Sequence, residues 1–447
     1  MLLNALLTLV TLAAVPMATL QAAHPGGPVM FTTEDGRQVP GPNCDCYVVS
    51  GPDPGYFQHY RFWDFRSVPL DPAVAKDFNF YPSVSVKGDA YGAGAQPVLL
   101  KDTPFSNDWN IQDWHRNGSR LFPITIVNSD QNVFITKSLS GPDSTFLALR
   151  NTRLERFSST AEIESGFRNF LHCSLRVRLR LLGKDEPILS PPTVQQAPVD
   201  ENQMLLVNPE SVALVRRNAR RHPPPNGACA GIFTYFSTTS ESDIEILTAD
   251  PPNRVHYANQ PDYDPVSDRV IPGASIVRDV PVPWTSWSTH RLDWFSTISR
   301  WYVENQFQDH MTYSVPHDPS MLIINLWSDG GLWSGNLTVG ESVHLGIEWI
   351  ELAYNVTGAP IKRDADVDDE VHIQVYPPHS KHYQTDGHEL SKSPAFETSD
   401  NNNEQEHILK RNQGKECKVM CRVDDVKHNG IPEIVLNYTP DAEPETY

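Results

Sequence analysis

Short runs of alternating hydrophobic and polar residues recur between about residues 44 and 358. From Leu175 to Leu181, arginine alternates with leucine or valine. Such alternation places hydrophobic side chains on one face of a β-strand and polar ones on the other, so each run predicts a strand with one face on a core. Similar runs occupy residues 133–139, 144–150, 230–236, 241–247, 289–295, 300–306, 321–327 and 343–355. Turn-forming residues separate them and no long helical pattern intervenes, which predicts an all-β sandwich rather than a parallel α/β sheet.

The N-terminal segment does not share this pattern. Residues 1–23 are hydrophobic and end in small residues, which predicts a secretory signal peptide. A membrane anchor is the alternative, disfavoured by Asn4, Pro16 and the lack of a basic flank. We expect one β-sandwich catalytic domain over residues 24–358, with an insertion at 190–227 between two strands.

Residues 359–447 are interpreted as an acidic linker or tail. Between residues 360 and 416 the chain is polar, charged and poor in large hydrophobic residues, so we expect this tail to be largely disordered. A short strand-like segment with Cys417 and Cys421 follows, in which Asn429-Gly430 suits a hairpin turn.

The composition fits a folded, exported protein. The 447 residues are 39% hydrophobic and carry a formal net charge of −19, which would repel nucleic acid. Six cysteines are too few for a disulfide scaffold. Cys229, in a hydrophobic run, is expected to be a buried free thiol, whereas Cys417 and Cys421 could pair locally, with the connectivity left open. Four sequons predict glycosylation: Asn117, Asn336, Asn355 and Asn437. We expect a secreted glycoprotein of the extracellular space or cell wall, with no membrane span after signal removal.

The run ESDIEIL at residues 241–247 places three carboxyl groups on one face of a predicted strand. Glu241, Asp243 and Glu245 alternate there, and Ile244 and Ile246 lie on the opposite face. A second alternating acidic run, at residues 364–370, has few hydrophobic neighbours and is interpreted as solvated charge. A strand that is hydrophobic on one face and acidic on the other predicts a cleft lined by carboxyl groups.

Paired carboxyl groups in a cleft suit the hydrolysis of a glycosidic bond with retention, in which one acts as nucleophile and the other as general acid. Residues two apart on a strand lie about 6.5 Å apart and residues four apart about 13 Å, so the strand must curve for Glu241 and Glu245 to act together. Their repulsion would hold one group protonated near neutral pH. Calcium binding is the alternative, but no dense loop of oxygen ligands accompanies the run.

Other chemistries find little support in the sequence. No motif of a serine hydrolase, zinc protease or P-loop is present, and we expect no metal and no cofactor. His256 and His290 are interpreted as cleft or structural histidines rather than catalytic bases.

Aromatic residues provide candidate sugar-binding groups, because sugar rings stack their C–H faces on aromatic planes. Seven tryptophans follow the acidic run, and for most of them a place in the sandwich core is the simpler interpretation. Trp327 and Trp333 lie among glycine, serine, aspartate and asparagine, as in a loop at a groove rim. Tyr257, Asn259 and Gln260 are further candidates for substrate binding.

The stretch SESDIEIL, preceded by AGIFTYF and followed by HRLDW and NLWSDGGLWSG, resembles glycoside hydrolase family 16 over about residues 44–357, in particular the secreted fungal branch related to β-1,3(4)-glucanases. The resemblance implies a concanavalin A-like β-jelly-roll sandwich with a concave glycan-binding groove. By the family motif Glu-x-Asp-x-Glu, Glu241 would be the nucleophile, Glu245 the general acid/base, and Asp243 the residue that tunes the pair. The spacing is similar to the lichenase and wall-transglycosylase form rather than the bulged laminarinase form.

The sequence therefore predicts a secreted, retaining endo-β-glucanase-like enzyme, a monomer that acts on β-1,3 or mixed-linked β-glucan. A cell-wall transglycosylase with the same carboxyl groups is one alternative. A catalytically silent glycan-binding lectin is another, although binding alone gains little from carboxyl groups that repel each other. A structural, calcium-bound wall protein is a third.

Overall fold

The structure is a computed structural model, and it describes residues 30–32, 38–40, 43–51, 55–76, 95–139, 144–184, 186–191, 222–264, 269–357 and 417–437. The predicted signal peptide, most of the 190–227 insertion and the polar 360–416 segment lie outside these residues. Within the described part of the chain, no helix is long and hydrophobic enough to cross a membrane.

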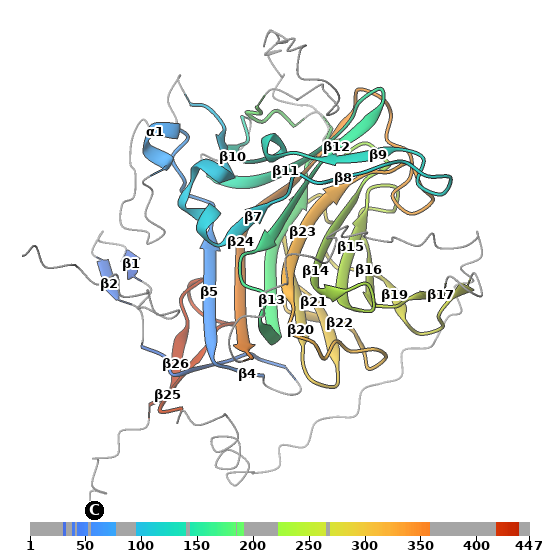
Figure 1. Cartoon of the computed structure of the whole chain (residues 1–447). Coiled ribbons are helices and arrows are strands. Elements are labelled where there is room, and N and C mark those ends of the chain that lie inside the picture. The colour runs from blue at the N-terminus through green and yellow to red at the C-terminus, as the bar shows by residue number, and fades with distance from the viewer. Residues whose placement is uncertain are drawn as a thin grey trace, which may run out of the picture.

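Most of the described residues belong to two stacked layers of β-strands (Figure 1). The layer that we call the first sheet has the spatial order β7 (Trp109–Ile111), β12 (Phe157–Ser165), β23 (Met321–Trp327), β14 (Cys229–Ser237), β15 (Ser240–Leu247), β16 (Arg254–Asn259) and β19 (Ser275–Asp279). Every one of these neighbouring pairs is antiparallel.

The other layer, the second sheet, is built around the long strand β24. Its order is β22 (Gln306–Met311), β21 (Ser299–Val303), β20 (Ser288–Trp294), β13 (Phe170–Leu181) and β24 (Ser342–Val356), followed by β11 (Thr145–Arg153) beside the first half of β24 and β5 (His59–Asp64) beside its second half. Strand β10 (Val133–Lys137) pairs with β11, and β6 (Val98–Leu99) with β10.

The two layers are continuous at one edge. Strand β12 pairs with β11 of the second sheet and, in parallel, with β9 (Thr125–Asn128), which in turn pairs with β8 (His115–Arg116). The pairings thus join 18 of the described strands, and the fold is the jelly-roll sandwich that the sequence predicts.

Short elements complete the described fold. They are β1 (Met30–Thr32), β2 (Gln38–Pro40), α1 (Pro72–Ala75), β17 (Tyr263–Asp264), β18 (Arg269–Val270) and three 3₁₀ turns at Leu100–Asp102, Pro104–Asn107 and Asp130–Asn132.

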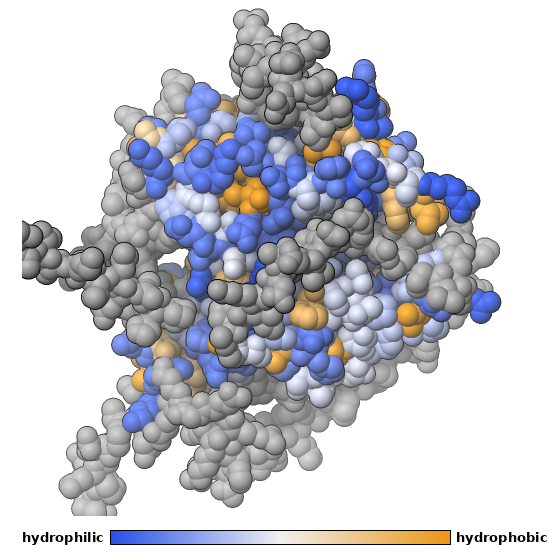
Figure 2. All heavy atoms as spheres, viewed as in Figure 1, coloured by the Kyte–Doolittle hydropathy of each residue, from blue (hydrophilic) through white to orange (hydrophobic). Residues whose placement is uncertain are grey.

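The hydrophobic core lies between the two sheets. Leu175, Val177 and Leu179 of β13 face Ile244 and Ile246 of β15 in one continuous cluster, and all five are buried. Trp284, Trp294 and Trp301 belong to the same cluster, which confirms the core interpretation for these three tryptophans. On the face seen in Figure 2, by contrast, hydrophobic residues form small patches among hydrophilic ones.

A four-stranded sheet packs against part of the outer face of the second sheet. It consists of β4 (Tyr56–Phe57), β3 (Cys46–Val48), β25 (Val419–Arg422) and β26 (Glu433–Asn437), with β25 parallel to β3 (Figure 1). The C-terminal part, residues 417–437, is named the clamp segment below. The sequence assigns this segment to an acidic tail, whereas the structure packs it on the sandwich.

Two disulfide bonds attach the clamp segment to the N-terminal part of the chain. Cys421 pairs with Cys44 and Cys417 with Cys46, so these cysteines do not pair locally with each other. Cys229 is buried and free, as the sequence predicts, and so is Cys173.

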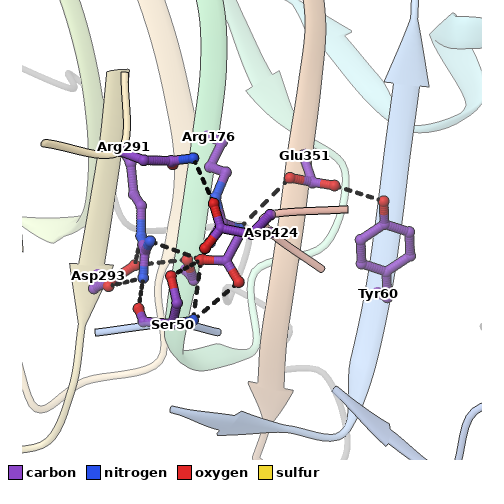
Figure 3. A network of polar contacts seen from close by, with 10 residues as sticks. Ser50, Tyr60, Arg176, Arg291, Asp293, Glu351 and Asp424 are labelled. Atoms are coloured by element: carbon purple, nitrogen blue, oxygen red, sulfur yellow. Dashed lines mark hydrogen bonds and ion pairs between the residues drawn. The ribbon is translucent and has the colours of Figure 1, made fainter. Parts of the chain in front are cut away.

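The clamp segment inserts one carboxylate into a buried polar network (Figure 3). Arg176 donates to Asp424 over 3.1 Å and Arg291 over 2.9 Å, and Ser50 donates through its backbone N–H and its hydroxyl. Asp293 pairs with Arg291 and Glu351 with Arg176, and the Tyr60 hydroxyl donates to Glu351 (Figure 3). Burial by itself would raise the pKa of Asp424, but the two guanidinium groups hold that pKa below its ordinary value.

The four sequons differ in their structural surroundings. Asn117 and Asn336 are exposed, and the side chain of Asn437 lies outside the described residues. Asn355 is different: its Oδ1 accepts from the Gln58 backbone at 3.0 Å and its Nδ2 donates to the Tyr56 carbonyl at 3.4 Å. A glycosylated Nδ2 retains one hydrogen, so glycosylation of Asn355 stays a prediction.

Candidate active site

Strand β15 carries the three carboxyl groups on the face opposite to the core. Ser242, Ile244 and Ile246 are buried between the sheets, so Glu241, Asp243 and Glu245 point out of the first sheet. Pairing with β14 sets Glu241 beside Tyr235, Asp243 beside Phe233 and Glu245 beside Gly231. The predicted carboxyl-bearing face with a hydrophobic layer behind it is therefore present.

Gln260 contacts the carboxyl group of Asp243 and the backbone of Glu241. Its side-chain amide donates to Asp243 at 3.0 Å and its backbone N–H to the Glu241 carbonyl at 3.0 Å. Its Oε1 in turn accepts from the Asp262 backbone at 3.0 Å, which fixes the orientation of the amide. Asp243 is also two residues from Glu241 on the same face of β15, and its charge disfavours the ionisation of Glu241.

Glu245 has different neighbours. Its Oε1 accepts from the Trp333 indole at 3.2 Å and lies 3.5 Å from the Cys229 sulfur. His256 occupies the adjacent position on β16, where its ring packs edge-on against Trp333 at 4.9 Å and its Nε2 lies 2.5 Å from Asp250. The two glutamates of the motif thus sit in distinct hydrogen-bonding environments, as groups with different roles require.

All three carboxyl groups hold protons more tightly than in water. Burial raises the pKa of Glu245 to about 7, with repulsion from Asp243 second, while His256 and Trp333 oppose the shift. Burial also raises the pKa of Asp243 to about 7. The pKa of Glu241 is raised well above its ordinary value, first by burial and then by Asp243. A carboxyl group that stays protonated near neutral pH can act as a general acid.

Two of the predicted substrate-binding residues face the wrong side. Tyr257 is fully buried in the core and stacks on Trp301 at 5.2 Å, and Asn259 is also buried and donates to the Tyr313 carbonyl at 2.9 Å. The reason is the register of β16, which places His256 beside Glu245 and so directs Tyr257 toward the core.

The register also reveals residues that the sequence analysis missed. In one row across the first sheet, Glu162 of β12 pairs with Asn325 of β23, Asn325 with Gly231, and Gly231 with Glu245. Glu162 accepts from the Trp114 indole at 2.9 Å and from the Asn325 amide at 3.1 Å, and burial raises its pKa to about 7. The alternation of Glu162 and Glu164 was a weak signal for this position, because only the pairing relates it to the acidic run.

A small pocket lies at this end of the row. It is lined by Trp114, Arg116, Ile126, Asn128, Ala161, Glu162, Asn325 and Trp327. Trp327 is largely buried in its wall, and Trp333 is half-buried beside Glu245. The two tryptophans predicted at a groove thus lie on the carboxyl-bearing side of the sheet. Among the described residues, no cluster of three or more His, Cys, Asp or Glu has metal-binding geometry.

The chain is similar in sequence to bacterial β-glucanases. The "Beta-glucanase" of Bacillus subtilis (strain 168) is 23% identical over 195 residues, which cover 41% of this chain and 75% of the relative. That of Bacillus licheniformis is 24% identical over 193 residues, with the same coverage. No protein-family model matches the chain.

Solved structures of similar proteins are also found. The Bacillus licheniformis β-glucanase matches with a TM-score of 0.39 and 16% identity, covering 56% of this chain and 94% of that one. The laminarinase from Rhodothermus marinus matches with a TM-score of 0.37 and 14% identity, covering 59% and 94%.

Proposed function

From the premise that this chain is a glucanase-like glycoside hydrolase of family 16, we propose that it is a retaining endo-enzyme that cleaves β-1,3 or mixed-linked β-glucan by double displacement. The observation that carries the proposal is the set of three carboxyl groups on one face of β15, with the two glutamates in different hydrogen-bonding environments. The β-glucanase relatives support the choice of substrate class.

In this proposal Glu241 is the nucleophile. Attack on the anomeric carbon requires its carboxylate form. Burial and Asp243 raise the pKa of Glu241, so Glu241 must lose its proton when substrate binds, and Asp243 is the neighbouring carboxyl group that can take it. Gln260 assists by holding Asp243 in place through its amide. Positive charge that develops on the sugar in the transition state favours this ionised form of Glu241.

Glu245 is the general acid/base. With a pKa of about 7 it is largely protonated in weakly acidic solution, and it can protonate the leaving glycosidic oxygen. After the leaving group departs, the resulting carboxylate takes a proton from the water that releases the product.

The pocket at Glu162 would bind a sugar unit of the same glucan. The half-buried Trp114 offers aromatic surface to a sugar ring there. We also propose that the protein is secreted, glycosylated at the exposed Asn117 and Asn336, and monomeric.

Product analysis tests the proposed reaction. The full chain is incubated with laminarin, lichenan and xyloglucan, and the anomeric configuration of new reducing ends is followed by proton NMR. We expect internal cleavage of laminarin or lichenan with the β-anomer formed first. Initial release of the α-anomer, or no cleavage of any β-glucan, would contradict the proposal, and products longer than the substrate would identify a transglycosylase.

The pH dependence provides a second expectation. Because the acid form of Glu245 is required and its pKa is about 7, kcat/KM on an unactivated glucan should fall as the pH rises through about 7. An aryl glycoside with a good leaving group needs no proton for the first step, so its glycosylation step should not show this alkaline limb. Initial rates across the pH range on both substrates check this expectation.

A further inference from the structure

The absence of a side chain at Gly231 leaves room for a thiol beside the proposed acid/base. Gly231, the direct partner of Glu245 on β14, has no side chain, and a Cβ at this position would lie 2.7 Å from Oδ1 of Asn325. The next residue of β14 on the same face is Cys229, whose sulfur lies 3.5 Å from Oε1 of Glu245. The thiol occupies the space beside Gly231 and Glu245 and is completely buried.

The same carboxyl oxygen has a second donor. The Trp333 indole donates to Oε1 of Glu245 at 3.2 Å, and Trp333 and Cys229 are also in contact with each other. Burial first, and the nearby Glu245 second, raise the pKa of Cys229 well above its ordinary value. The thiol therefore keeps its proton and remains a hydrogen-bond donor over the working pH range.

We propose that Cys229 is a positioning residue for Glu245: together with Trp333 it fixes Oε1, so that Oε2 carries the proton delivered to the glycosidic oxygen. This inference rests on the proposed function, in which Glu245 is the acid/base. A neutral thiol suits the task because it adds no charge beside three carboxyl groups that already repel one another.

The charges around Glu245 define the expected effect on its titration. Asp243 on the same strand and Asp262 after β16 favour the protonated form, whereas His256 on β16 favours the ionised form. The thiol of Cys229 donates to the carboxylate and so also favours ionisation, as the Trp333 indole does. Loss of the thiol should therefore raise the pKa of Glu245.

The test compares Cys229→Ala, Cys229→Val and Cys229→Ser with Cys173→Ala. Cys173 is the matched control because it is the other buried free thiol and lies in the core cluster between the sheets. In Cys229→Ala and Cys229→Val we expect kcat on glucan to fall about tenfold with little change in KM, because general-acid catalysis depends on geometry. The alkaline limb of the pH profile of kcat/KM should shift to higher pH by about half a pH unit.

Two comparisons separate positioning from structural damage. Cys229→Ser keeps a hydroxyl donor, so its kcat should be close to that of the wild type and its alkaline limb should lie at the wild-type pH. Cys173→Ala should have the wild-type kcat per folded molecule and the wild-type alkaline limb. On an aryl glycoside with a good leaving group, the glycosylation step of all variants should equal that of the wild type.

The inference is overturned if Cys229→Val, which conserves volume and removes the donor, matches Cys173→Ala in kcat and in the alkaline limb. It is also overturned if Cys229→Ser is as impaired as Cys229→Val. In both cases Glu245→Gln still lowers kcat on glucan by about 10²–10⁴-fold. Wild-type-like activity of Glu245→Gln would instead refute the proposed function itself.

Discussion

Replacement of Glu241 by Gln should abolish glucan hydrolysis, with a loss of kcat of roughly 10⁴-fold or more, because an amide cannot form the glycosyl-enzyme bond. The change conserves the shape of the side chain and removes one of the carboxyl groups crowded on this face of β15. The measurement is the initial rate of reducing-end release from laminarin and lichenan. Glu348→Gln is the matched control, since Glu348 pairs with Arg178 on the second sheet.

Glu245→Gln should behave differently from Glu241→Gln on activated substrates. Loss of the acid should lower kcat on glucan by about 10²–10⁴-fold, but an aryl glycoside with a good leaving group should still form the intermediate. A burst of phenol release in Glu245→Gln and none in Glu241→Gln would support the two assignments. The opposite pattern would exchange the roles of the two glutamates.

Neither substitution should cost stability near neutral pH. The folded-state pKa values of these carboxyl groups are raised, so between the unfolded-state pKa of about 4.3 and the folded value the folded protein binds more protons than the unfolded chain. The contribution of these groups to the free energy of unfolding is therefore fully present below pH 4 and is lost as the pH rises toward and above neutrality. A glutamine does not ionise, so Glu241→Gln should melt at or above the wild-type temperature at pH 7–8, and a clear drop would show that Glu241 has a structural role.

The largest expected effect on stability is that of Asp424→Asn in the clamp segment. This substitution removes one negative charge from a buried site in contact with Arg176 and Arg291 and leaves both cations under-compensated. Breaking such a buried network costs about 3–5 kcal/mol, which corresponds to a decrease in Tm of roughly 10 °C. Thermal unfolding at pH 7 measures the effect.

Asp425→Asn is the control for this prediction. Asp425 is the next residue, but it is exposed and its contact with Asn305 is a 3.3 Å hydrogen bond at the surface. Its substitution should change stability by less than about 0.5 kcal/mol. Equal Tm values for the two variants would show that the network does not hold the clamp segment.

The pH adds an internal check on Asp424→Asn. Because the pKa of Asp424 is lowered by the fold, its contribution is fully present above the unfolded-state value of 3.8 and is lost as the pH falls through the lower, folded-state value. The difference in stability between wild type and Asp424→Asn should therefore be largest near neutral pH and shrink in acid.

The sequence by itself determined the local features of this protein. Alternation is a property of each strand alone, so the chain could be recognised as all-β, and the run at residues 241–247 as a strand with acids on one face and Ile244 and Ile246 on the core. The burial of Cys229 was predictable for the same reason, since it begins a hydrophobic run.

Only the tertiary structure decided which strands are neighbours and in which register they pair. A period of two is common to all strands, and a shift by one residue exchanges the two faces, which is why His256, and not Tyr257 or Asn259, lies beside Glu245. Only such pairings bring Cys229 to Glu245 and place Glu162 in the same row of the sheet. The attachment of Cys421 to Cys44 spans 377 residues, and no local pattern encodes a contact over that separation.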